Sequence, residues 1–135
     1  MSVLKVGARV QELDSVLDFV NGELDKLECP MRAAMQIDIA VEEIFVNIAH
    51  YAYGSGVGEA EIRMEGEAGG SGARITFLDS GVPYDPLQKE DPDITLPAAQ
   101  RDIGGLGIFM VKKSMDDLSY EYRGGQNVLQ LLKKW

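Results

Sequence analysis

The stretch E-E-I-F-V-N-I-A-H-Y-A-Y-G, from Glu42 to Gly54, places a carboxylate and a carboxamide four residues apart in an apolar segment. Residues four apart lie one above the other on a helix, so Glu43 and Asn47 would share one helical face. An amide oxygen is a hard ligand that suits Mg²⁺, and a carboxylate can accept a proton from an attacking hydroxyl or water. The pair could therefore divide the work of a metal-assisted transfer between its two members.

A solvated polar surface is the other interpretation of this helix face, which also carries Gln36 and His50. No Lys or Arg stands between Met35 and Tyr53, whereas exposed faces of this length usually carry some. On this stretch alone both interpretations stay open. We interpret His50, the only histidine, as a helix-face imidazole without a catalytic duty. The opposite helix face is apolar and carries Ile37, Val41, Ile44 and Ile48.

Asp79 follows the apolar run I-T-F-L and opens the sequence D-S-G-V-P-Y-D-P. A carboxylate at the end of a buried strand can accept a hydrogen bond from an amino group. Gly81, two residues later, would let a flat ring approach the backbone. The pattern is compatible with an adenine site, although a D-x-G sequence is more often a plain turn.

Three glycines, Gly104, Gly105 and Gly107, stand in the sequence I-G-G-L-G-I-F-M-V. Glycines that open a helix expose unpaired N–H groups at its positive end, which is a ready anion site. A tight packing turn is the other interpretation. The cluster is not a P-loop, because no G-K-[ST] follows it, and it is not a Rossmann fingerprint, because a loop rather than a strand precedes it.

Apolar periodicity predicts the elements that must position these residues. Helical spacing runs through 13–27 and is closed by Cys29-Pro30, then resumes over 31–51 and over 106–113. Strands are predicted at 2–10 (an edge strand), 59–65, 73–78, 118–123 and 127–133, with hairpins at 67–72 and at Gly124-Gly125. This order predicts an α+β two-layer sandwich, with helices on one face of a mixed, largely antiparallel sheet.

The segment 80–103 contains Pro83, Pro86, Pro92 and Pro97 and is too rich in proline to be regular. Structureless connections of this length in a compact domain are usually lids, binding loops or disordered segments. Its two ends carry the Asp79 and glycine motifs, which favours a lid. We expect a single domain over 1–135.

Composition narrows the function classes. The 135 residues are 45% hydrophobic and 26% charged, as in an ordinary globular domain. The formal charge of −9 argues against direct nucleic-acid binding, because such proteins need a basic face. A single cysteine, Cys29, excludes an internal disulfide, and no apolar run approaches membrane-spanning length. We therefore expect a cytoplasmic protein without membrane contact, in which Cys29 is incidental.

A Glu-x-x-x-Asn helix, Asp-x-Gly-x-Pro after a strand, a lid, and Gly-Gly-Leu-Gly opening a helix occur here in one order. That order resembles the Bergerat (GHKL) ATP-binding fold of DNA gyrases, heat-shock chaperones and histidine kinases. Within this superfamily the chain is similar to the bacterial anti-sigma factor serine/threonine kinases. The narrower likeness rests on D-S-G-V-P-Y-D-P at 79–86, G-G-L-G-I-F-M-V at 104–111 and M-D-D-L-S-Y at 115–120, followed by G-Q-N-V-L-Q-L. It spans nearly the whole chain.

The resemblance implies a site for ATP and Mg²⁺. By this likeness Asn47 coordinates Mg²⁺ and Glu43 is the base that activates the acceptor hydroxyl. Asp79 binds the adenine amino group, and Gly81 makes room for the ring. The resemblance also implies contacts to the phosphates from the end of the lid and the helix that follows it, namely Arg101, Gly104, Gly105, Leu106 and Gly107. One departure is that many relatives carry His four residues after the Asn, where this chain has Tyr51.

The implied reaction transfers the ATP γ-phosphoryl group to a serine or threonine of a STAS-type anti-sigma factor antagonist. The same domain, as a homodimer, would also sequester a sigma factor. An alternative is a nucleotide-gated module that binds its partner without phosphorylating it, and a nucleotide-free α+β adaptor is a third possibility. The presence of Glu43 favours the kinase, because a pure binder needs no base.

Overall fold

The computed structural model of the protein describes residues 1–54, 56–88 and 105–135. It confirms each helix and strand predicted from the sequence, with differences at the boundaries. The elements are β1 (Ser2–Gly7), η1 (Val10–Glu12), α1 (Leu13–Lys26), α2 (Met31–Tyr51), β2 (Glu59–Gly66), β3 (Gly72–Asp79), η2 (Pro86–Gln88), α3 (Gly105–Ser114), β4 (Asp117–Arg123) and β5 (Gln126–Lys134).

The first strand is shorter than predicted. β1 ends at Gly7 rather than at residue 10, because the chain turns there and Val10–Glu12 form a short 3-10 helix. The Arg9 N–H donates to the Gly7 carbonyl oxygen at 2.8 Å, which closes the turn. The prediction of an edge strand is nevertheless confirmed, since among the described strands β1 pairs only with β2.

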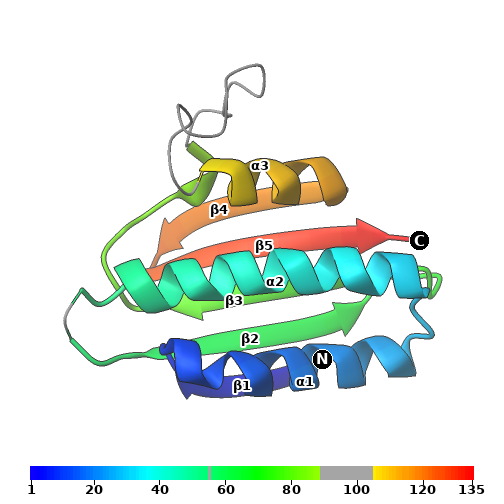
Figure 1. Cartoon of the computed structure of the whole chain (residues 1–135), viewed down its shortest axis with the longest axis horizontal. Helices are drawn as coiled ribbons and strands as arrows, with labels where there is room; N and C mark the ends of the chain where they lie inside the picture. Colours follow the sequence, from blue (N-terminus) through cyan, green and yellow to red (C-terminus); the bar gives the residue numbers. More distant parts are fainter. Residues whose placement is uncertain (55, 89–104) are drawn as a thin grey trace.

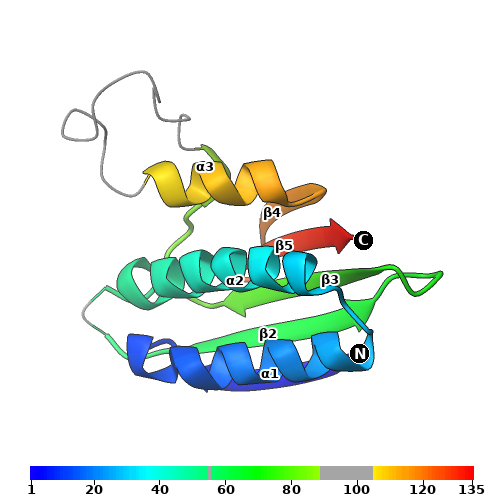
Figure 2. The same cartoon turned by 45° about the vertical axis from the view of Figure 1, so that its right-hand side comes forward.

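The five strands form one sheet in the order β1-β2-β3-β5-β4, and each pairing of neighbours is antiparallel. The α-helices lie side by side on one face of this sheet, with α2 between α1 and α3 (Figures 1 and 2). The predicted two-layer α+β sandwich is therefore confirmed. Since every described pairing is antiparallel, the sheet is more uniform than the mixed sheet that we predicted.

The core lies between the two layers. Because side chains alternate along a strand, one face of β2, β3 and β5 supplies the apolar residues that pack under the helices. The most buried members of this core are Ile62, Ile75, Phe77 and Leu131 from the sheet, Val16, Val20 and Leu24 from α1, Ile37, Val41, Ile44 and Phe45 from α2, and Ile108 and Val111 from α3.

α1 and α2 are joined by a tight turn. Glu28 has φ = 55°, in the left-handed region, and the Cys29 N–H donates to the Leu24 carbonyl oxygen at 3.1 Å. Pro30 then precedes the first residue of α2, as the sequence predicted. Burial raises the pKa of the Cys29 thiol, which disfavours the reactive thiolate. Within the described ranges, no helix combines the length and the apolar character needed to cross a bilayer.

Tyr53, just beyond the end of α2, fastens that end to the sheet. Its hydroxyl donates to the Glu59 carbonyl oxygen at 2.6 Å and accepts from the Ser80 N–H at 2.8 Å. Gly58 is needed beside it, because a Cβ there would overlap the Tyr53 ring. One hydroxyl thus holds together the end of α2, the start of β2 and the residue after β3.

Substituting Tyr53→Phe should lower the free energy of unfolding by about 1–2 kcal/mol, since both hydrogen bonds are lost while the ring is kept. Urea denaturation monitored by circular dichroism would measure the change. Tyr51→Phe is the matched control, because among the described residues the Tyr51 hydroxyl has no hydrogen-bond partner. Equal stability of the two variants would show that the two hydrogen bonds of the Tyr53 hydroxyl do not stabilise the fold.

Candidate nucleotide site

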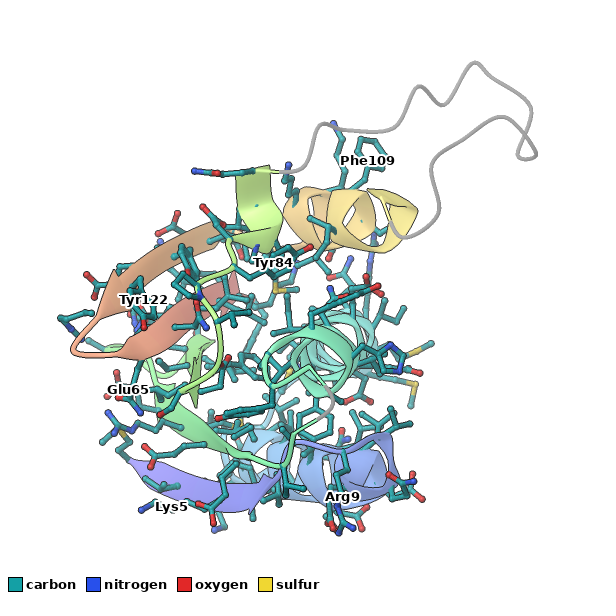
Figure 3. The ribbon with its side chains drawn as sticks, turned by 90° about the vertical axis from the view of Figure 1, so that its left-hand side faces the viewer. Lys5, Arg9, Glu65, Tyr84, Phe109 and Tyr122 are labelled. Atoms are coloured by element: carbon teal, nitrogen blue, oxygen red, sulfur yellow. The ribbon has the colours of Figure 1, made fainter. Side chains whose placement is uncertain are left out.

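One helix end and two strand ends meet at one edge of the molecule. α2 ends at Tyr51, β3 ends at Asp79, and β5, which runs antiparallel to β3, begins there at Gln126. The strand register places Asp79 of β3 directly across from Asn127 of β5. This edge lies on the left in Figure 1 and faces the viewer in Figure 3.

A cavity of about 30 Å³ opens at this edge. Its apolar walls come from α2 and from the core faces of β3 and β5, namely Ile44, Ile48, Phe77 and Leu129. Its polar lining groups are Asn47, Asp79, Tyr84, Tyr120 and Asn127. Mostly apolar walls with a few convergent polar groups are typical of sites that bind small molecules or cofactors.

Asp79 is the buried carboxylate of this cavity, with 6% of its surface exposed. Its Oδ1 accepts from the Gly81 N–H at 2.9 Å and from Asn127 Nδ2 at 2.9 Å. No donor in the described ranges reaches Oδ2, and no fully buried side-chain oxygen there lacks a partner, so Oδ2 is not fully buried. One acceptor therefore remains for a ligand amino group.

Gly81 allows a close approach between two backbone segments. A Cβ at this position would overlap the Ala52 carbonyl group, and the adjacent Val82 N–H donates to the same Ala52 oxygen at 2.8 Å. The glycine thus lets the segment after β3 pack against the end of α2. Its role toward an adenine ring stays a prediction, and the contact with Ala52 is a second reason for a glycine here.

Glu43 and Asn47 lie under the first turn of α3. Asn47 Nδ2 donates to Glu43 Oε1 at 3.4 Å. A Cβ on Gly107 would overlap the Glu43 carboxylate, so the carboxylate lies against the backbone of α3 near its positive end. Both side chains are half-buried. The pair is therefore not part of a fully solvated surface, and its functional role stays a prediction.

Asn47 also has a side-chain oxygen that could bind Mg²⁺. Because its Nδ2 is engaged by Glu43, its Oδ1 is the atom left to bind, and among the described residues it accepts no hydrogen bond. No group of three or more His, Cys, Asp or Glu side chains in the described ranges could hold a metal ion. A single amide ligand suits Mg²⁺, which usually keeps several waters and shares the phosphates of its substrate.

The structure describes some, but not all, of the remaining residues that the sequence predicted for the site. Arg101 and Gly104 lie outside the described residues. Gly105 and Leu106 are the first two residues of α3, ahead of Gly107. His50 is exposed, does not line the cavity and meets the Tyr51 ring edge-on at 6.1 Å between centroids.

A family model described as a histidine kinase-like ATPase domain matches residues 6–133. The chain belongs to this family. The matched residues run from β1 into β5 and so include the whole candidate site. The broad resemblance to this family of ATPases is thereby confirmed, and the fold class with it.

This histidine kinase-like ATPase domain is similar in fold to a crystal structure of the RsbU and RsbW domains of Rv1364c from Mycobacterium tuberculosis. The TM-score is 0.63 at 14% sequence identity, and the match covers 99% of this chain but 32% of that one. At this identity the likeness shows the fold. None of the curated proteins matches the sequence.

The sequence of this histidine kinase-like ATPase domain did not predict a role in the site for two of its side chains, Asn127 and Tyr120. Asn127 precedes Leu129 and Leu131 at alternate positions, so it lies on the buried face of β5. A polar residue on the core-facing side of a predicted strand was the available signal. The role of Asn127 depends on its pairing with Asp79 of β3, and the periodicity of the sequence does not reveal which strands pair.

Gly81→Ala should destabilise the domain by about 1–3 kcal/mol, because the added methyl group meets backbone atoms of Ala52 that cannot move aside like a flexible side chain. Thermal unfolding would measure the loss. Gly22→Ala is the matched control. Nothing lies near a Cβ at Gly22, in the middle of α1, so that variant should gain about 0.5–1 kcal/mol. Similar shifts in both variants would contradict the close packing at Gly81.

Proposed function

We propose that this domain is an ATP-binding anti-sigma regulatory factor with serine/threonine protein kinase activity. The observation that carries the proposal is the convergence of Asp79, Asn47, Glu43 and the first turn of α3 at one end of α2. Membership of the histidine kinase-like ATPase family supports ATP as the nucleotide. Mg²⁺, the kinase reaction and the partners are inferred from the motif resemblance.

Recognition of the base would use the cavity beside Asp79. The free Oδ2 would accept from the adenine amino group, and the apolar walls of α2 and the sheet would cover the ring faces. The phosphates would lie toward α3, where Gly105 and Gly107 open the helix, with Arg101 and Gly104 as further contacts. Asn47 would hold Mg²⁺, which supplies charge neutralisation when bound.

The transfer step would move the γ-phosphoryl group from ATP to a hydroxyl oxygen of the antagonist. The bond from the γ-phosphorus to the acceptor oxygen forms, the bond to the β–γ bridging oxygen breaks, and ADP leaves. Glu43 would accept the hydroxyl proton. Most of the catalysis would come from positioning and charge neutralisation, as is general for phosphoryl transfer.

The proposed partners are a sigma factor and a STAS-type antagonist, bound by a homodimer in the cytoplasm. Support comes from the motifs at 79–86, 104–111 and 115–120, and from the fold likeness to a structure that contains an RsbW domain. The alternative is a nucleotide-gated module without kinase activity. The contact of the Glu43 carboxylate with Asn47 and α3 gives this side chain a positioning role that even a pure binder could use.

ATP should bind in a Mg²⁺-dependent manner, and both Asp79→Asn and Asn47→Ala should weaken binding by at least about tenfold, the cost of one lost charge-assisted bond or metal ligand. Isothermal titration calorimetry with and without Mg²⁺ measures this. Absence of binding by the unsubstituted protein would leave a nucleotide-free adaptor and overturn the proposal.

Glu43→Gln should reduce phosphoryl transfer by about 10²–10⁴-fold while ATP still binds, because the amide cannot accept the proton. Radiolabel transfer to a STAS-type antagonist measures the rate. Glu42→Gln is the matched control, since Glu42 is the neighbouring exposed carboxylate on the outer side of α2. ATP binding without any transfer by the unsubstituted protein would favour the nucleotide-gated module.

A further inference from the structure

Asn127 is buried, with 6% of its surface exposed, and uses its whole amide group. Its Nδ2 donates to Asp79 Oδ1 at 2.9 Å and to the Val82 carbonyl oxygen at 2.8 Å. Its Oδ1 accepts from the Tyr84 N–H at 3.0 Å and from the Tyr120 hydroxyl. These bonds tie β5 to the end of β3, to the segment that follows β3 and to β4.

These bonds allow only one orientation of the amide. If the amide were flipped, its oxygen would face two acceptors, the Asp79 carboxylate and the Val82 carbonyl, while its NH₂ group would face the Tyr84 N–H. Burial raises the pKa of Tyr120, so its hydroxyl stays protonated and can donate to the amide oxygen in this orientation. Asn127 therefore presents a fixed donor to Asp79.

We propose that Asn127 is the positioning residue for base recognition, holding Asp79 with Oδ1 occupied and leaving Oδ2 as the acceptor for the base, so that the site selects a base that carries an amino group. This inference rests on the proposed nucleotide binding and adds a residue to it. An acceptor-only contact discriminates between purines. Adenine presents an exocyclic amine to the carboxylate, whereas hypoxanthine presents a carbonyl oxygen in the same place, which a carboxylate repels.

The informative variant is Asn127→Asp, which keeps the shape of the side chain and replaces the donor by a second carboxyl group. Two carboxyl groups in hydrogen-bond contact share a proton as the pH falls. The ionisable residues lining the cavity are Asp79 itself, Tyr84 and Tyr120, with Asp85 close to Tyr120. α2 contributes only neutral groups to this lining and Asp85 is not part of it, so among the lining residues only the carboxyl pair would titrate below neutral pH.

The experiment compares the dissociation constants of ATP and inosine triphosphate, each with Mg²⁺, from about pH 8 to about pH 5.5, a range in which a carboxyl pair can take up a proton. Both nucleotides carry the same triphosphate, so its titration cancels in their ratio. The unsubstituted protein should prefer ATP by at least about tenfold throughout. In Asn127→Asp the preference should fall toward unity as the pH is lowered, because the carboxyl pair takes up a proton, and with that proton on Asp79 Oδ2 the group can donate to the inosine carbonyl.

One further variant keeps the test decisive. Asn127→Ala removes the donor without adding a charge, so it should weaken ATP binding by about tenfold with no new pH dependence. Thermal unfolding without nucleotide confirms that each variant is folded.

If Asn127→Asp kept a constant ATP preference over the pH range, or if Asn127→Ala bound ATP as tightly as the unsubstituted protein, the positioning role would be overturned while ATP binding by the unsubstituted protein still supported the proposed function. If the unsubstituted protein bound neither nucleotide, the proposed function would fall and this inference with it. The two failures are therefore distinguishable.

Discussion

The hydrogen bond between Asp79 and Asn127 is the constraint on which the site depends. These two are the polar residues that the described part of the chain buries in its core. A buried carboxylate and a buried amide are costly unless their hydrogen bonds are made, so the fold must bring them together. They meet because β3 and β5 pair with Asp79 opposite Asn127. A slip of one residue would turn Asn127 to the other face of the sheet and leave Asp79 unpaired.

α2 carries the second constraint, because one helix serves both the core and the site. Ile44 is buried in the core, while Asn47, less than one turn later, lines the cavity and reaches back to Glu43. The end of the helix is held by Tyr53 and by the contact between Ala52 and the segment after β3. Positions along the helix are thereby fixed relative to Asp79, and a polar pair four residues apart becomes part of a site.

The sequence was sufficient for features whose cause is local. Helical and alternating periodicity predicted the elements, and Glu43 with Asn47 or Asp79 with Gly81 could be recognised because each pair lies within a few residues. Asn127 and Tyr120 could not be assigned, because their roles come from a strand register between distant segments. Gly81 shows the same limit, since its steric reason is the backbone of Ala52 at the end of another element. β1 ends early because of a turn that is closed by the hydrogen bond from the Arg9 N–H to the Gly7 carbonyl oxygen, and the periodicity of the sequence does not reveal such a bond.

The size of the cavity connects base recognition to the segment after β3. About 30 Å³ accommodates roughly one water molecule, so a purine ring requires a wider space. Ile44, Phe77 and Leu129 belong to the close-packed core and move little, whereas Tyr84 and Pro86 lie between β3 and the end of η2. Tyr84 is held by its N–H bonds to Asn127 Oδ1 and to the Tyr120 hydroxyl. Outward movement of this wall would therefore release the oxygen side of the Asn127 amide, while its Nδ2 would keep its bonds to Asp79 and Val82. The side chain that orients the recognising carboxylate can thus stay in place while the cavity widens to admit the base.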